Sequence, residues 1–224
     1  MCKTETFMFN GYEAQVILPE NPNGKWVWKT EFFTAFDDAE QALSAEGYTR
    51  VYYHISDKYG SYRAVRLMHA FHKQAVQKYA LEQKAVLFGF SRGGLYAFNY
   101  TLFYPEWVEK VYLDAPVLDI TTWPHNGTAE QRQMFAEYGL SEQTLRRFHG
   151  NPINNLPEFF ACGVPLLLVA GDADEVVAYE HNAGKMIAYC QKHGIPLQYR
   201  IKHGGKHHPH SLSDVQPIVE FVCK

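Results

Sequence analysis

The chain has 224 residues, of which 46% are hydrophobic and 20% are charged, and its formal net charge is -3. This length and apolar content can supply one sizeable core. The slightly acidic balance provides no basic surface for nucleic acid, and no apolar run approaches the ~20 residues that span a bilayer. We therefore expect a single domain, residues 1–224, with no nucleic-acid or membrane partner and with its oligomeric state open.

The N-terminus and the cysteines bear on the compartment. The opening MCKTET lacks the hydrophobic stretch of a signal peptide, so we expect a cytoplasmic protein or, alternatively, the mature form of an exported one. The four cysteines have no CxxC spacing, which argues against a thiolate zinc site. Free thiols are expected if the compartment is reducing.

Apolar runs and turn residues alternate through the N-terminal half in the manner of strands and helices. Strands are predicted at residues 13–18, 25–28, 49–55 and 85–88. Helices are predicted at 31–46, at 63–81 and from Leu95 to a stop at Pro105. The first of these helices is inferred from apolar residues at every third or fourth position between Phe32 and Leu43, with Gly47 as its C-cap.

The C-terminal half continues the alternation around one irregular segment. Strands are predicted at residues 110–113, 164–170 and 197–201, and helices at 179–193 and 214–222. Residues 117–163 are broken by proline and glycine into two short helical pieces, 128–138 and 141–149, which is typical of a small cap inserted between two core strands. The pattern predicts an α/β fold: a mostly parallel, doubly wound sheet with helices on both faces.

One stretch carries a chemical motif. Gly89-Phe90-Ser91-Arg92-Gly93-Gly94 lies between a predicted strand and a predicted helix. Strand, Gly-x-Ser-x-Gly, helix is the context of a nucleophile elbow, where a sharp turn exposes the serine hydroxyl. The glycines at 89 and 93 let neighbouring backbone approach that turn.

Here the chain resembles the α/β-hydrolase superfamily over nearly its whole length. Residues 24–33, 114–117 and 207–212 also resemble a subgroup of esterases, dienelactone hydrolases and prolyl-peptidase-like proteins. The resemblance implies the α/β-hydrolase fold with residues 117–163 as a small helical cap. It also implies a serine hydrolase with a Ser-His-Asp triad, an oxyanion hole and no cofactor.

The acid of such a triad follows a late strand of the sheet. In hydrolases of this type it sits in a Gly-x-x-Asp-x-x-Val arrangement, which falls on Asp174. Its work is to hold the histidine tautomer and to stabilise the imidazolium. Asp172 is a rival, although a structural role in the turn suits it better, and Asp114 after an earlier strand is a second rival.

The base is expected in the histidine-rich segment after the last strand. Chain order Ser, Asp, His and the preceding Gly204-Gly205 loop favour His207, and only one of His207 and His208 should reach Ser91. We expect His203 to lie within the strand and His210 to cap the last helical region.

Four histidines within eight residues could also bind a metal. The usual arrangement places two of them four residues apart on a helix, and Gly-Gly and proline interrupt any helix here. We therefore expect no metal.

The oxyanion hole needs two backbone N–H groups. The residue after the nucleophile, Arg92, is expected to supply one. Many relatives carry His-Gly in the other loop, where this chain has Trp28-Lys29-Thr30-Glu31. The second donor is therefore expected at Lys29 or Thr30, and we assign it to Lys29. The Arg92 side chain is left with two roles, a pocket cation or a salt bridge.

Three aromatic residues, Trp28, Trp123 and Tyr59, are candidate pocket walls, although aromatic side chains are core material first. The leading hypothesis is a serine carboxylesterase that cleaves a small or short-chain ester, such as that of an acylated sugar, through an acyl-enzyme. Alternatives are a peptidase, thioesterase or acyltransferase with the same triad, or a non-catalytic binding protein on this scaffold.

Overall fold

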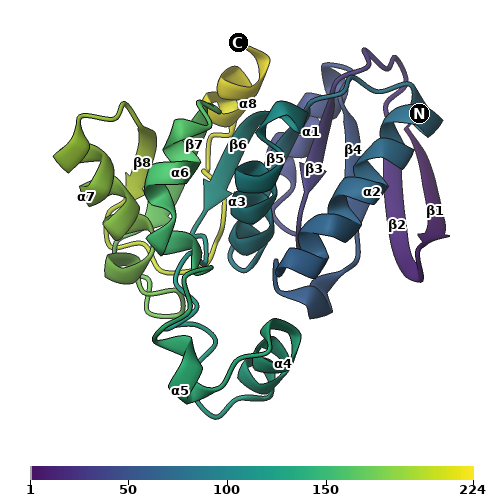
Figure 1. Ribbon diagram of the computed structural model, residues 1–224. Coiled ribbons are helices and arrows are strands. Elements are labelled where there is room, and N and C mark those ends of the chain that lie inside the picture. Colours follow the sequence, from purple (N-terminus) through teal and green to yellow (C-terminus); the bar gives the residue numbers. More distant parts are fainter. Residues whose placement is uncertain (1) are drawn as a thin grey trace.

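A single eight-stranded sheet organises the computed structural model, which describes residues 2–224 (Figure 1). Its strands are β1 (Lys3–Phe9), β2 (Tyr12–Leu18), β3 (Trp26–Lys29), β4 (Thr49–Tyr53), β5 (Ala85–Phe90), β6 (Val108–Asp114), β7 (Leu166–Gly171) and β8 (Gln198–Lys202). They are ordered β1-β2-β4-β3-β5-β6-β7-β8; β2 pairs antiparallel with β1 and β4, and every other pair is parallel. The predicted mostly parallel α/β sheet is confirmed.

Helices cover both faces of this sheet (Figure 1). On one face, α2 (Tyr62–Tyr79), α3 (Gly93–Phe103), α6 (Leu156–Ala161) and α7 (Ala183–His193) contribute to the larger buried cluster. On the other, α1 (Asp38–Ala45) and α8 (Gln216–Cys223) form the smaller cluster with β3, β5, β6 and β7. The central strands are buried on both sides, as parallel strands usually are.

The segment between β6 and β7 contains α4 (Ala129–Tyr138), α5 (Glu142–Leu145) and α6. In Figure 1, α4 and α5 lie below the sheet, and α6 returns to pack against α3. The Tyr59 hydroxyl donates to Gln133 of α4 (2.8 Å), and the Tyr138 hydroxyl donates to the Tyr59 carbonyl (2.8 Å). The division into one domain with a cap at 117–163 stays a prediction.

The structure corrects the helix predicted at residues 31–46. Only α1, from Asp38, is helical, and residues 30–37 form a loop. Phe32 (φ 58°) and Phe36 (φ 52°) have left-handed backbone conformations that no right-handed helix contains. The aromatic spacing looked helical because Phe33 and the α1 residues are buried, whereas Phe32 and Phe36 are over a third exposed.

Four smaller differences concern elements that were not predicted or that have other ends. Strand β1 and helix α6 were not predicted, α5 is shorter than the helix predicted at 141–149, and a 3-10 turn (η4, Tyr179–His181) precedes α7.

The cysteines Cys2, Cys162, Cys190 and Cys223 are free. Among residues 2–224, none of the helices is both long enough and apolar enough to cross a bilayer.

His72 of α2 is fully buried in the larger core cluster. Its Nε2–H donates to the Gln83 carbonyl (2.7 Å), and its Nδ1 accepts from the Tyr100 hydroxyl (2.8 Å). The neutral imidazole, with its proton on Nε2, satisfies both ring nitrogens without burying a charge. Burial accordingly lowers the pKa of His72 to about 4, from 6.5.

This burial predicts an acid-sensitive fold. Between pH 6.5 and about 4 the unfolded chain binds a proton that folded His72 does not, so stability is full above pH 6.5 and falls as the pH drops towards 4. We expect His72→Gln to remove about 2 kcal/mol of the loss in unfolding free energy between pH 7 and pH 5. Urea unfolding of both proteins at the two pH values measures it. Equal losses in wild type and variant would contradict the assignment.

Candidate active site

Ser91 lies at the turn between β5 and α3. Its φ of 50° is left-handed, and the turn is held by three hydrogen bonds: Ser91 N–H to the Asp114 carbonyl (3.0 Å), and the Ser91 carbonyl to Gly94 N–H (2.9 Å) and Val117 N–H (2.8 Å). A Cβ at Gly93 would lie 2.9 Å from Thr30 Oγ1, so glycine is required by close approach. The predicted strand–turn–helix context of the motif is present.

The structure brings Ser91, His207 and Asp174 together from three loops. His207 Nε2 lies 3.0 Å from Ser91 Oγ, and His207 Nδ1 lies 2.7 Å from Asp174 Oδ2. All three side chains are buried. Because a carboxylate can only accept here, Nδ1 carries the proton and Nε2 is left to accept from the serine hydroxyl. This arrangement can abstract the serine proton.

Asp174 is held in its ionised form. Its Oδ1 accepts the backbone N–H groups of Val176 and Val177, each at 2.9 Å. Burial would raise the pKa of this carboxyl, but the hydrogen bonds from His207, Val177 and Val176 outweigh burial and hold the pKa below its usual range. A charged Asp174 can stabilise an imidazolium on His207.

Close backbone approach sets the distance between the acid loop and the histidine loop. Ala173 N–H donates to the Gly205 carbonyl (3.0 Å). A Cβ on Gly171 would collide with that same carbonyl oxygen. Gly171 and Gly205 therefore allow the two loops to lie in contact, which is what places His207 against Asp174.

Both rival acids have partners of their own. Asp172 pairs with exposed His203 (2.8 Å) and accepts Gly204 N–H (2.6 Å), a structural role in the turn. Asp114 is fully buried and pairs with His210 Nδ1 (2.7 Å) while accepting from the Tyr112 hydroxyl and Ser211 N–H. His210 therefore does not cap the last helix, and His203 follows β8 rather than lying in it.

The loop after β3 contains the residues predicted to supply the second oxyanion donor. Thr30 N–H is taken by the Phe88 carbonyl (3.0 Å), which continues the sheet. Lys29 lies within β3, and its ammonium is buried against Glu40 (2.7 Å) and the Ala35 carbonyl (2.6 Å). Lys29 thus anchors the loop of residues 30–37 from behind. Within the described chain, the first amides of this loop without an acceptor are those of Glu31 and Phe32.

Arg92 takes the salt-bridge role. Its guanidinium pairs with Glu31 (3.1 Å) and lies 5.3 Å from the Phe32 ring centroid. Burial raises the pKa of Glu31, although Arg92 and the Ser56 hydroxyl oppose this shift. The contact places the Phe32 ring beside the Arg92 side chain, and the backbone N–H of Arg92 is the first predicted oxyanion donor.

The three residues predicted to line the pocket have different environments in the structure. Trp28 is core: it is 1% exposed and stacks against Trp26 at 5.8 Å, so its assignment to the pocket is wrong. Tyr59 is also buried and supports the partly exposed Trp123 at 6.4 Å. Phe32 and Phe36 were not among the predicted pocket residues, because the helix predicted at 31–46 placed them on its buried face.

Fold and site together define a serine hydrolase. Residues 44–224 match the model of the prolyl oligopeptidase family (Peptidase_S9), and the chain belongs to that family. No curated protein sequence matches the chain.

Solved structures share the fold at low sequence identity. A substrate-bound FphF, a fluorophosphonate-binding serine hydrolase of Staphylococcus aureus, has a TM-score of 0.72 and 14% identity, over 99% of this chain and 95% of its own. A puromycin-hydrolyzing peptidase of Mycobacterium tuberculosis has a TM-score of 0.72 and 14% identity, over 98% of this chain. Dipeptidyl peptidase 4 of Porphyromonas gingivalis has a TM-score of 0.69 and 13% identity, also over 98%. This chain spans only 37% and 34% of those two peptidases. The likeness identifies the α/β-hydrolase fold.

The two adjacent aspartates allow a matched test of the acid. Asp174→Asn should lower kcat about 10⁴-fold because an amide does not enforce the required His207 tautomer. Asp172→Asn should leave kcat close to wild type, since its partner His203 lies outside the site. Steady-state ester hydrolysis by both variants, with folding checked by thermal melts, decides between them. A larger loss in the Asp172 variant would contradict the assignment.

Proposed function

We propose that this serine hydrolase is a carboxylesterase acting on a small, uncharged ester through Ser91, His207 and Asp174. The observation that carries the proposal is the continuous hydrogen-bonded row from Ser91 Oγ through His207 to Asp174, at 3.0 and 2.7 Å. Distances of this size suit proton transfer without further movement of the side chains.

The proposed reaction has two halves. Ser91 Oγ attacks the acyl carbon while His207 Nε2 takes its proton, and His207 then returns that proton to the departing alcohol. Water, deprotonated by His207, next cleaves the acyl-enzyme and frees the acid. Asp174 remains ionised throughout and stabilises the transient imidazolium.

The developing oxyanion is assigned to two backbone amides. Arg92 supplies the first. We assign the second to the Phe32 amide in place of Lys29, because Phe32 contacts Arg92 and its N–H has no acceptor. Thr30 Oγ1 positions this loop by donating to the Gly93 carbonyl (2.8 Å) and lies 3.1 Å from the Phe88 carbonyl.

The groups around Ser91 favour a neutral substrate. Glu31 is engaged by Arg92 and Ser56, and Asp114 by His210, Tyr112 and Ser211. Neither carboxylate is presented to a peptide ammonium. Exposed or partly exposed apolar side chains, Phe32, Phe36, Trp123 and Val176, belong to the loops that carry the site, and aromatic faces of this kind suit an acyl chain or a sugar ring.

A peptidase is the second candidate. The family match and two of the similar structures support it, since the latter are described as a puromycin-hydrolyzing peptidase and a dipeptidyl peptidase. The same row of three residues could cleave an amide, provided that the leaving amine is protonated by His207.

Matched substrates separate the two candidates. We expect hydrolysis of p-nitrophenyl acetate and no hydrolysis of dipeptidyl p-nitroanilides, and Ser91→Ala should lower kcat by about 10⁴–10⁶-fold. Chromogenic assays with equal enzyme concentrations measure both. Cleavage of the anilides at rates comparable with the ester would favour the peptidase, and an unchanged rate in Ser91→Ala would exclude Ser91 as the nucleophile.

The loop assignment predicts an effect at Thr30, which does not touch Ser91 Oγ. Thr30→Val keeps the side-chain shape but removes the hydroxyl that tethers the loop to Gly93, so kcat and kcat/KM should both fall about fivefold, the equivalent of one hydrogen bond. Thr30→Ser retains the hydroxyl and should restore activity. A change confined to KM in Thr30→Val would contradict a role in transition-state stabilisation.

A further inference from the structure

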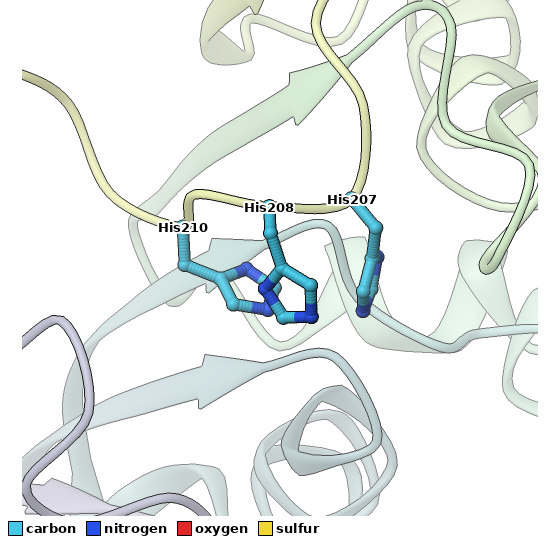
Figure 2. A group of neighbouring side chains, drawn as sticks. All are labelled: His207, His208 and His210. Carbon is cyan, nitrogen blue, oxygen red and sulfur yellow. The ribbon is translucent and has the colours of Figure 1, made fainter.

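Three of the four histidines in the segment after β8 gather at the active site. His207, His208 and His210 each offer a ring nitrogen, and these three nitrogens lie within 4.8 Å of one another (Figure 2). The ring centroids are separated by 4.8 Å for His207–His208, 4.8 Å for His207–His210 and 4.9 Å for His208–His210. The proposed esterase reaction uses only His207.

The hydrogen bonds of His210 leave one ring nitrogen, Nε2, available to bind a metal ion. It is 5% exposed, and its Nδ1 lies 2.7 Å from Asp114, whose other carboxylate oxygen accepts from Tyr112 and Ser211. The carboxylate fixes the proton on Nδ1 and leaves the Nε2 lone pair free. That Nε2 is buried and has no hydrogen-bond partner, which is costly for a polar atom unless a ligand satisfies it.

His207 repeats the same arrangement with Asp174. Histidines that bind metal commonly donate the other ring N–H to a carboxylate, which orients the ring and raises its basicity. His207 and His210 therefore both have Nδ1–H held by a buried aspartate; His210 Nε2 has no partner, and His207 Nε2 accepts only from the Ser91 hydroxyl, which a metal ion would displace. His208 is exposed and stacks on Phe36 (ring centroids 5.8 Å), at the outer side of the cluster.

The loop backbone is fixed independently of the imidazoles. Lys202 Nζ donates to the carbonyls of Pro209 (2.8 Å) and Ser211 (3.3 Å), on either side of His210. Gly-Gly and proline do prevent a helical histidine pair, as the sequence indicated. The loop instead gathers the rings by its own turns.

We propose that His207, His208 and His210 form a binding site for a divalent transition metal ion such as Zn²⁺, and that the ion reversibly inhibits the hydrolase. Three imidazoles with a fourth position for water match the coordination that zinc accepts. Zinc–nitrogen bonds of 2.0–2.1 Å bring ligand nitrogens to roughly 3.4 Å, so the rings move closer together on binding, and the exposed His208 is the freest of the three to move.

Inhibition follows because the metal site and the catalytic base share one atom, His207 Nε2. His207 Nε2 cannot bind the metal and accept the Ser91 proton at once, so the bound ion withdraws the base. This consequence rests on the proposed hydrolase function, whereas metal binding itself does not.

Binding is tested first, without activity. In a Ser91→Ala, Cys2→Ser, Cys223→Ser chain, which lacks the nucleophile and the exposed thiols, Zn²⁺ binding is measured by calorimetry and Co²⁺ binding by its visible absorption. Tetrahedral Co²⁺ bands and one bound ion are expected. Adding His208→Gln should weaken binding at least about tenfold, and His210→Gln should do the same.

His203→Gln is the matched control, because His203 is an exposed imidazole of the same segment but pairs with Asp172. It should leave the affinity unchanged. Binding that survives His208→Gln, or that His203→Gln weakens equally, would overturn the site.

Inhibition is tested next on the chain with Ser91. Zn²⁺ should inhibit p-nitrophenyl acetate hydrolysis, a chelator should restore it, and His208→Gln should raise the inhibition constant by the same factor as the binding constant. Each variant is compared with its own metal-free rate. Activation by Zn²⁺, or inhibition that His208→Gln does not relieve, would overturn the inhibitory role. Binding to the Ser91→Ala chain without any ester hydrolysis by wild type would contradict the proposed function alone.

Discussion

The left-handed turn at Ser91 is the constraint on which the site depends. Its φ of 50° reverses the chain sharply between β5 and α3, and the glycines around it let neighbouring segments pack closely against the turn. Gly93 leaves room for Thr30, Gly94 for Pro116, and Gly89 for Ala97 and Leu113. The same contacts attach the loop after β3 and the loop after β6 to the elbow. The turn therefore presents the serine hydroxyl and also sets the loops that surround it.

The buried carboxylates around the site each have a separate positively charged or imidazole partner. Asp174 serves His207, Asp114 serves His210, Glu31 holds Arg92, and Glu40 holds Lys29. Each carboxylate has a cation or an imidazole of its own, although Glu31 Oε1 has no hydrogen bond, so the space near Ser91 keeps little unpaired charge. This pairing is the physical basis for expecting an uncharged substrate, and it also leaves one buried imidazole nitrogen, His210 Nε2, without a partner.

The sequence predicted those features that depend on local pattern. Alternating strands and helices indicated the sheet, and the motif spacing selected Ser91, Asp174 and His207, which the structure places in hydrogen-bonding contact. The sequence-based prediction was wrong where tertiary contacts override the periodicity of apolar residues. Phe32 and Phe36 have helical spacing but left-handed backbones. The aromatic character of Trp28 suited either the core or the pocket, and nothing in the sequence showed that the Lys29 side chain is buried. The Asp114–His210 pair joins residues 96 positions apart, which no local pattern reveals.

The most direct test of this account is labelling with a fluorophosphonate probe, followed by peptide mass spectrometry. We expect one covalent adduct, on Ser91, with labelling slowed strongly in His207→Gln because the serine then lacks its base. An adduct on another residue, or labelling of Ser91 that is as fast in His207→Gln as in wild type, would contradict it.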